Sequence, residues 1–544
     1  MQVPKPTSVG AESKPSCDDS SHSNTMATEL VEKDRDVTER GARLILITLG
    51  IMAATLMQTL DSTIVNVALP TIQGNLGATQ EEGAWVVTGY IISAVIVIPV
   101  TPWLQARFGR KQYYSVAIIG FTIASMLCGV ASSIEQLILF RIIQGLFGGG
   151  LVATSQASLR DTFPRHLLGA SQAVFALGAI VGPSVGPTVG GWLTDNFSWN
   201  WVFFINIVPG VFAAIVVLTM MRNPSDPKPI PIDALGLALL ATGLGSLQYI
   251  LDEGQRNDWF SDPVIRLFGF TTVLGIAAFI CWELWGTKRP IVDLRAFKYR
   301  AIAAGSALGF AIGSVLFGAT VILPQYVQGI LGFTATLSGE LIFVRAAFIA
   351  LLTPFIARLA GSGRIDTRIL LVTGFILIGA SQIWLGYITT SQNDFNSLLG
   401  PAIMAGVGLG LLFVPLSIAV LSALPPEAIP KATAFQALSL QLGGSFSTAA
   451  LITLLARRNA FHQSVLADSA TPDNIALKIL IEHTHSTTAA VGNLYQHILT
   501  QAGVMAYADA QWALGALTFF LLPLVFVLPK RRKGAAAPVH IPVE

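Results

Sequence analysis

The chain has 544 residues, of which 53% are apolar and only 12% are charged, and its formal net charge is +2. A soluble domain is about 25% charged, so this composition excludes a large soluble protein and a disordered chain. The small net charge offers no field for a polyanion, and no nucleic-acid partner is expected. With a mean hydropathy of +0.64, the sequence predicts an all-α polytopic membrane protein.

The chain begins with a polar segment, residues 1–43, of mixed charge. It lacks the apolar core of a signal peptide, so we expect a disordered cytoplasmic tail. The cysteines Cys17, Cys128 and Cys281 show neither a disulfide framework nor a zinc-site spacing.

Fourteen apolar runs follow, each long enough to cross a bilayer as a helix. They cover 44–67, 84–103, 113–132, 137–157, 168–192, 201–221, 234–251, 264–285, 301–326, 337–357, 369–388, 398–423, 432–455 and 509–529.

Lys and Arg are concentrated in the even-numbered loops and in the C-terminal tail, whereas the odd loops 1 to 11 hold only Arg256 and Arg266. The positive-inside rule then places both termini in the cytoplasm. This orientation requires an even number of spans.

The chain also repeats itself. One constant shift aligns Gly148 with Gly410 and Gly182 with Gly444, so spans 4–5 resemble spans 12–13. Repeated helical halves are typical of secondary transporters, with a site near the midplane between them. The predicted organisation begins with a six-helix bundle at 44–221, followed by two inserted helices and a cytoplasmic linker at 222–300. A second six-helix bundle with a long outer loop at 456–508 covers 301–529, and a cytoplasmic tail covers 530–544.

Ionisable residues inside the spans are functional candidates, because a charge at membrane depth is costly. Asp61 lies in span 1 with no opposite charge within one helical turn. Desolvation disfavours a charged carboxylate, so Asp61 is a candidate for proton exchange; a structural pair with a distant Arg is the alternative. Arg141 in span 4 either modulates this proton site or pairs to hold the bundle.

Span 10 carries Glu340 and Arg345, five residues apart and therefore poorly placed to pair along one helix. Glu340 is a second candidate for proton coupling, or else a residue of the outer mouth. Arg345 and Gln58 are predicted to line a cavity.

Span 5 carries glycines at four-residue steps, interrupted by two prolines. Such a stripe lets another helix approach closely, and each proline removes a backbone donor. The span is either a hinge or seal between bundles or an ordinary glycine-packed helix. The residues concerned are Gly178, Gly182, Pro183, Gly186, Pro187, Gly190 and Gly191.

Loop 2 carries a basic motif that topology alone explains, with a gating role as the sharper hypothesis. Its residues are Arg107, Gly109, Arg110 and Lys111. The histidines of the long outer loop favour a solvated loop over a metal site, and no metal is expected; they are His462, His483, His485 and His497. We find no catalytic triad or phosphate loop, so neither an enzyme nor ATP-driven transport is expected.

Several segments together resemble the fourteen-helix drug:proton antiporters of the major facilitator superfamily, EmrB/QacA type, over about residues 44–530. The matching segments are LDSTIVNVALP (60–70), FRIIQGLFGGG (140–150), GAIVGPSVGPTVGG (178–191), WNWVFFINIVPG (199–210), ELWGTKRPIVDLRAF (283–297), QALSLQLGGSFS (436–447) and AYADAQWAL (506–514).

The resemblance implies a role in protonation or substrate binding for Asp61 and in proton coupling for Arg141. It places Asn66, Gln144 and Gly145 in the helix-1 and helix-4 motifs, and the span-5 glycines in a surface that controls leak. Two positions depart from the family pattern: Ala106 replaces the usual loop-2 Asp, and Leu440 replaces a common span-13 Arg.

The resulting expectation is a multi-pass protein of the inner membrane that exports amphipathic or toxic small molecules in exchange for protons, with no cofactor other than the proton gradient. By resemblance, a periplasmic adaptor and an outer-membrane channel are further expected partners, with the loop at 456–508 as the docking element. The alternatives are uptake or uniport of a metabolite without proton exchange, and a membrane-embedded enzyme or sensor.

Overall fold

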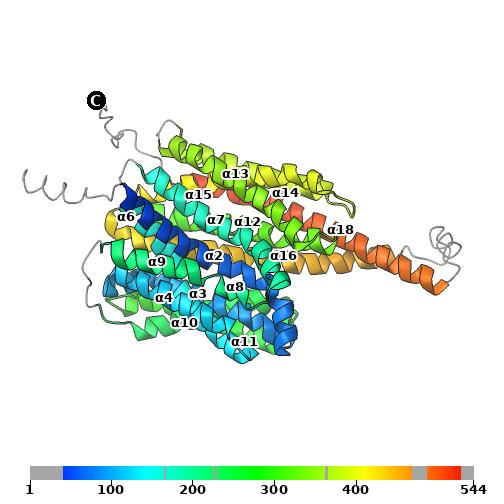
Figure 1. Cartoon of the computed structure of the whole chain (residues 1–544), viewed down its shortest axis with the longest axis horizontal. Helices are drawn as coiled ribbons and strands as arrows, with labels where there is room; N and C mark the ends of the chain where they lie inside the picture. The colour runs from blue at the N-terminus through cyan, green and yellow to red at the C-terminus, as the bar shows by residue number, and fades with distance from the viewer. Residues whose placement is uncertain are drawn as a thin grey trace, which may run out of the picture.

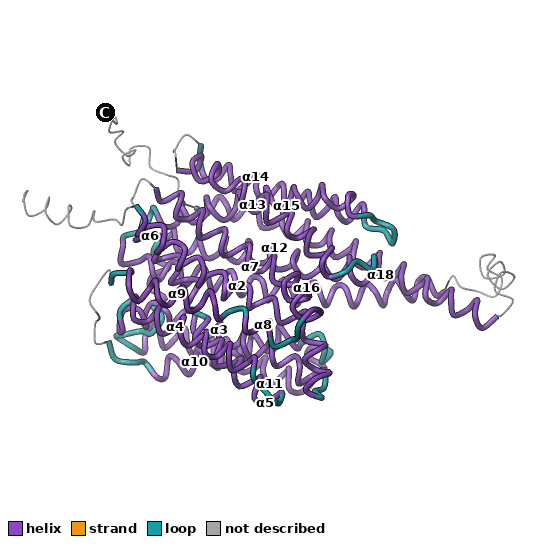
Figure 2. The backbone as a smooth tube through the Cα atoms, in the orientation of Figure 1, coloured by secondary structure: helices purple, strands orange, loops and turns teal. Residues whose placement is uncertain are grey.

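The computed structural model describes residues 41–163, 167–223, 227, 230–361, 365–468 and 487–528. Within these ranges the regular structure is helical (Figure 2). Thirteen helices are long and apolar enough to cross a membrane, or fourteen if a bent pair within residues 170–196 is one span. This agrees with the predicted all-α polytopic fold.

The N-terminal bundle has six spans, of which the fourth and sixth are broken into two helices. Its helices are α2 (Ala42–Leu76), α3 (Gln80–Phe108), α4 (Arg110–Gly129), α5 (Ile134–Gly148), α6 (Leu151–Thr162), α7 (Leu168–Asn196), α8 (Trp201–Phe204) and α9 (Ile207–Met220). Polar caps set the starts of two of them: Thr79 and Glu82 form a capping box at α3, and the Ser133 side chain caps α5.

Two inserted helices pack against each other, and α10 also lies along α3. They are α10 (Ala234–Glu253) and α11 (Pro263–Cys281), with η2 (Trp259–Ser261) between them. The linker that follows contains the π-helix η3 (Trp282–Gly286) and the 3₁₀ helix η4 (Leu294–Lys298).

The C-terminal bundle also has six spans, in the same order along the chain as those of the N-terminal bundle. It consists of α12 (Arg300–Gly329), α13 (Ala335–Gly361), α14 (Thr367–Ile388), α15 (Phe395–Leu421), α16 (Ile429–Asp468) and α18 (Thr487–Leu521), with short 3₁₀ helices η5 (Pro426–Ala428) and η6 (Leu522–Val527).

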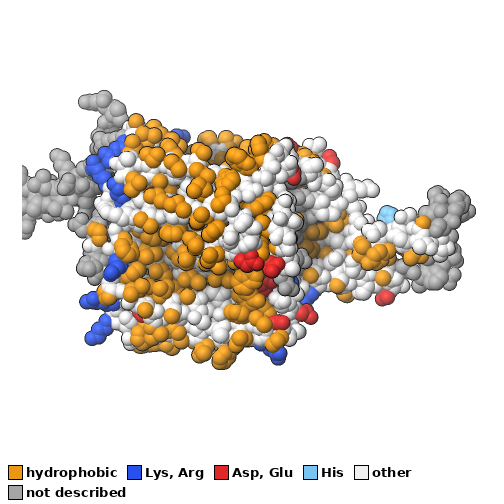
Figure 3. All heavy atoms as spheres, turned by 60° about the horizontal axis from the view of Figure 1, so that its bottom comes forward, with side chains coloured by type: hydrophobic (Ala, Val, Ile, Leu, Met, Phe, Trp, Pro, Cys, Tyr) orange, Lys and Arg blue, Asp and Glu red, His pale blue; other side chains and the backbone are white. Residues whose placement is uncertain are grey.

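The bundles meet along α7 with α13 and α3 with α16. We call the end of the molecule that carries residues 106–111 the basic end, because Lys and Arg gather on it (Figure 3). Near this end α6 also packs on α16, and Gln156 of α6 donates a 3.2 Å hydrogen bond to Ser417 of α15. Both side chains are buried, so here the two bundles are closed against each other.

The outer surface between the two ends is apolar (Figure 3). On α11, for example, Leu267, Phe270 and Val273 are 60%, 66% and 71% exposed. In water such a surface would be unstable, whereas lipid chains cover it without cost.

The structure differs from the long outer loop expected at 456–508. Residues 456–468 continue α16, and residues 487–508 already belong to α18. With 40 residues, α16 is about 60 Å long, twice the roughly 30 Å of a hydrocarbon core. The two helices therefore run past the others as a projecting pair (Figure 1). Low hydropathy ended the predicted span at residue 455, but it did not mark the end of the helix.

Candidate functional site

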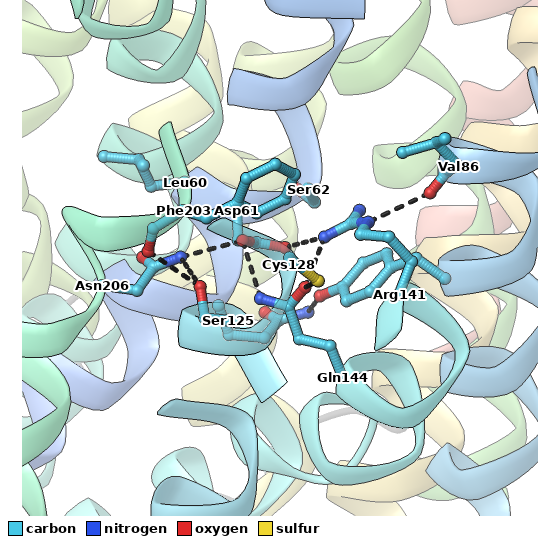
Figure 4. A network of polar contacts seen from close by, with 12 residues as sticks. Leu60, Asp61, Ser62, Val86, Ser125, Cys128, Arg141, Gln144, Phe203 and Asn206 are labelled. Carbon is cyan, nitrogen blue, oxygen red and sulfur yellow. Dashed lines mark hydrogen bonds and ion pairs between the residues drawn. The ribbon is translucent and has the colours of Figure 1, made fainter. Parts of the chain in front are cut away.

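A fully buried ion pair lies inside the N-terminal bundle (Figure 4). Arg141 of α5 donates from Nη1 to Oδ2 of Asp61 of α2 over 2.6 Å. The two side chains are 1% and 0% exposed. The carboxylate treated as isolated on its own helix thus has a partner 80 residues away, which is the structural alternative left open by the sequence.

Two amides complete the surroundings of the carboxylate. Gln144 donates from Nε2 to Oδ1 of Asp61 at 2.9 Å, and Asn206 donates from Nδ2 to the same oxygen at 2.8 Å. The Oε1 atom of Gln144 accepts from Arg141 at 2.7 Å, so this amide bridges both charges. Three side chains donate to Asp61, which is the pattern of an ionised, acceptor-only carboxylate.

The guanidinium of Arg141 is held from α3 as well. Its Nε donates to the Val86 carbonyl at 3.0 Å, and its carbon lies 4.1 Å from the centre of the Tyr90 ring. Gly145, one turn after Arg141, lies against the Tyr90 backbone, where a larger residue would collide. This glycine therefore lets α5 approach α3 closely enough for the Val86 contact.

A second ring of polar groups fixes the amides. Asn206 also donates to Ser125 Oγ at 3.0 Å, and Ser125 donates to the Phe203 carbonyl at 2.9 Å. The Cys128 thiol donates to Gln144 Oε1 at 3.7 Å. Asn206 lies at the break between α8 and α9, so this break supplies a functional side chain to the network.

The network makes the two buried charges depend on each other. A buried pair is stable only while both charges are present, because a lone buried charge leaves a desolvation cost of about 3–5 kcal/mol uncompensated. Protonation of Asp61 would remove the counter-charge of Arg141, while the carbonyl oxygen of the carboxyl group would still accept from the amides. The arrangement thus connects the charge of Asp61 to the packing of five helical segments.

Two of the predicted coupling or motif residues lie outside this network. Glu340 has an exposed side chain near the start of α13, and Asn66 is exposed on α2. Gln58 donates to the Tyr90 hydroxyl at 3.3 Å. Gln58, Ser62 and Asn66 share one face of α2 at four-residue spacing, so they form a polar stripe beside the ion pair.

The glycines of α7 face α2 of the same bundle and not the opposite bundle. Substituted with a side chain, Gly178, Gly182 and Gly186 would each meet a threonine of α2; Gly190 would come within 2.7 Å of the Ile64 carbonyl. This stripe is thus a packing surface within one bundle, while α7 also packs on α13 across the bundle interface. Gly191 is buried next to it.

The prolines of α7 shape that packing. Pro187 has no N–H, so the Pro183 carbonyl lacks its helical donor. Thr63 of α2 donates to that carbonyl at 3.4 Å. The helix segments 170–183 and 185–196 are bent by 42° at this place.

The loop-2 motif holds its neighbours at the basic end. Arg110 pairs with Asp161 at the end of α6, and Arg107 donates to the Ile230 carbonyl. Gly109 has a φ of +85°, which favours glycine. The Lys111 backbone N–H donates to Asn223 at 2.9 Å. These contacts join spans 2, 3 and 4 to the linker after span 6.

The C-terminal bundle contains a different kind of buried charge. Arg345 is 2% exposed and donates to Thr320 at 3.0 Å. Its Nε has no hydrogen-bond partner, and no carboxylate of the described residues forms an ion pair with it. It borders a small cavity together with Ser381 and Gln382.

At the base of the projecting helix pair, Asp509 of α18 binds two residues of α16. Arg458 Nε and His462 Nε2 lie 2.5 and 2.8 Å from its Oδ2. These bonds tie the two helices together where they leave the bundle. Among the described residues no group of three or more metal-ligating side chains occurs; His483 and His485 lie outside those residues.

Asn206 and Tyr90 are the site residues that the sequence did not single out. A lone Asn within the apolar run of span 6 was the available signal. For Tyr90 there was none, because an aromatic residue in a span is ordinary.

Two helical bundles, the first of which contains a buried charge network, define a polytopic protein with the architecture of a secondary transporter. The model of the Major Facilitator Superfamily matches residues 51–448. The chain is 35% identical over 491 residues to the multidrug export protein EmrB of Escherichia coli K12, covering 89% of this chain and 95% of that protein. It is 32% identical to the fatty acid resistance protein FarB of Neisseria gonorrhoeae, covering 90% and 96%. The chain therefore belongs to the EmrB-type family of the Major Facilitator Superfamily.

The fold also resembles a solved structure, the proton:xylose symporter XylE, with a TM-score of 0.58. The sequences are 13% identical, and the match covers 90% of this chain and 97% of that one. This likeness confirms the major facilitator fold.

Proposed function

We propose that this protein exports amphipathic drugs or other toxic small molecules across the inner, cytoplasmic membrane in exchange for protons. The kinship with EmrB supports the export of drugs. The observation that carries the proton exchange is the buried Asp61–Arg141 pair. In this proposal the basic end faces the cytoplasm, in keeping with the positive-inside rule.

The proton and the substrate are coupled through helix packing. Asp61 receives a proton and releases Arg141, which keeps only Gln144, the Val86 carbonyl and the Tyr90 ring as neighbours. The loss of the ion pair weakens the contact between α2 and α5 and shifts the balance between conformations. The described conformation, closed at the basic end, is one of the two that alternating access requires.

The test is proton flux in proteoliposomes with an imposed pH gradient and a panel of lipophilic cations, weak acids and antibiotics. The wild type should release protons when a substrate is added. Asp61→Asn, which keeps the shape of the side chain but not its charge, should abolish this release. Asp195→Asn is the matched control, because Asp195 is an exposed carboxylate at the far end of α7.

Each other outcome has a defined meaning. Substrate flux with no proton movement in the wild type would contradict antiport and favour the uniport alternative. Equal proton movement in the wild type and Asp61→Asn would remove Asp61 from the mechanism and direct attention to Glu340. A ligand response without any flux would favour a sensor.

We further propose that the pair α16 and α18 docks a periplasmic adaptor, which in turn meets an outer-membrane channel. Its support is the projection of both helices and their exposed apolar side chains: Phe461 and Val465 on α16, and Val491 and Tyr495 on α18, are each at least 50% exposed. A polar substitution, Phe461→Asp, should prevent co-purification of the adaptor and leave proton release in vesicles unchanged. Co-purification at the wild-type level would contradict the proposal.

A further inference from the structure

A cavity of about 650 Å³ lies between the two bundles near the basic end. Its walls come from four parts of the chain that are far apart in sequence. The end of α3 contributes residues from Pro99 to Ala106, the segment after α9 contributes Ile230, the linker contributes residues 288–298, and the start of α16 contributes Lys431 to Phe435. The cavity is thus built only when the two bundles and the linker are together.

One side of the cavity is strongly cationic. The cationic side chains of the lining are Lys288, Arg289, Arg295, Lys298 and Lys431, and the one acidic side chain among the lining residues is Asp293. Lys431 bonds to Asp293 at 2.7 Å, so this carboxylate is already paired. Four cations remain without a carboxylate partner among the described residues. The positive-inside rule explains basic residues in a loop, but not their convergence on one cavity.

The rest of the lining is largely apolar and aromatic. It includes Trp103 and Pro99 of α3, Phe435 of α16 and Ile291 of the linker. Trp103 is nine-tenths buried and donates from Nε1 to the Pro231 carbonyl at 3.3 Å. Tryptophan with a bonded ring nitrogen is typical of the level at which lipid headgroups begin.

We propose that this cavity binds the phosphate-bearing headgroup of an anionic phospholipid, with the upper part of its acyl chains on the apolar wall. A soluble phosphate would use the cations but leave the apolar wall bare, whereas a lipid uses both. Ala106, which also lines the cavity, carries no charge, whereas an acidic residue there would cancel part of the positive field.

The bound lipid stabilises the conformation in which the basic end is closed. Because its contacts are divided between α3, the linker and α16, opening this end would separate them and release the lipid. A ligand that binds one conformation stabilises that conformation. The site itself stands on the geometry of the cavity, while its effect on export rests on the proposed function.

The test is lipid binding to the full chain in a neutral detergent, followed by native mass spectrometry and thermal unfolding. The probes are dioctanoyl phosphatidylglycerol, dioctanoyl phosphatidylcholine and inorganic phosphate. We expect the anionic lipid to bind and to raise the unfolding temperature, and the zwitterionic lipid to do neither. Each Lys or Arg near a membrane surface contributes about fivefold to anionic lipid affinity, so Lys288→Ala/Arg289→Ala should weaken binding roughly 30-fold.

Two further variants keep the test decisive. Arg358→Ala is the matched control, since Arg358 is exposed in the last turn of α13 and does not line the cavity; it should bind like the wild type. Ala106→Asp removes no contact but adds a negative charge to the wall, and should weaken binding about fivefold. Equal binding of the two lipids, or equal losses in Lys288→Ala/Arg289→Ala and Arg358→Ala, would overturn the proposal. Competition by inorganic phosphate to completion would assign the site to a soluble anion.

An export assay in vesicles distinguishes a failure of the lipid site from a failure of the proposed function. If the binding differences hold while no vesicle exports any substrate, the lipid site stands and the export proposal fails. If export proceeds but the lipid headgroup makes no difference to binding, the lipid site fails alone.

Discussion

The two bundles treat a buried arginine in opposite ways. In the N-terminal bundle, Arg141 has a carboxylate at 2.6 Å, an amide, a carbonyl and an aromatic face. In the C-terminal bundle, Arg345 has the Thr320 hydroxyl and a small cavity. Both side chains are at most 2% exposed, so the difference lies in their partners and not in their depth.

The two buried arginines therefore differ in the change of charge to which each responds. A compensated pair responds to a proton, because protonation changes the charge balance from neutral to positive. A cation without a carboxylate responds to an anion instead, because only added negative charge can compensate it. The two bundles are therefore expected to respond differently to a change of charge: the N-terminal bundle depends on the Asp61–Arg141 pair, whereas Arg345 of the C-terminal bundle has no carboxylate partner among the described residues.

The largest effect on stability is expected when Arg141 is replaced. Arg141→Met should lower stability by about 3–5 kcal/mol, because Asp61 would remain buried without a counter-charge. The thermal unfolding of the purified variant measures this. The double variant Asp61→Asn/Arg141→Met should recover much of the loss, and a double variant as unstable as the single one would show that the pair is not the cause.

A smaller effect should be the same in both bundles, since their packing is alike. Gly190 lies against the Ile64 carbonyl of α2, and Gly443 of α16 lies against the Phe310 backbone of α12. Because a methyl group at either place forces helices apart, Gly190→Ala and Gly443→Ala should each cost about 1–3 kcal/mol. Thermal unfolding again provides the measurement. A loss confined to one bundle would show that the repeated halves do not share their packing.

The smallest effect is expected at Arg345. Arg345→Met replaces a poorly compensated cation by an apolar side chain of similar length, so stability should stay within about 1 kcal/mol of the wild type or rise. A destabilisation as large as that of Arg141→Met would mean that Arg345 has a strong partner, and the contrast between the bundles would fail.

The sequence was sufficient for the fold but only partly for the site. Long apolar runs and the repeat predicted the membrane spans, because a segment in the hydrocarbon core must satisfy its own backbone hydrogen bonds, as a helix does. Asp61 and Arg141 stood out because charges in such runs are costly. Their pairing depends on the register between α2 and α5, and a sequence pattern does not contain that register. The orientation of the span-5 glycines toward α2 was equally inaccessible.

The projecting helices illustrate another limit. Polarity beyond residue 455 led to the prediction of a loop, but α16 continues through this polar stretch to Asp468. A membrane boundary and a helix boundary are set by different physics: transfer to lipid for the first, and backbone capping for the second.

The continuity of α16 has a mechanical consequence. The same unbroken helix begins beside η5, touches α3 and α6 of the opposite bundle, and continues to Asp468 outside the bundle. A rigid rod of about 60 Å that tilts by about 10° moves its far tip by roughly 10 Å. In the proposed export cycle, a small rocking of the C-terminal bundle would therefore be amplified at the tip of this helix, where the adaptor is proposed to dock.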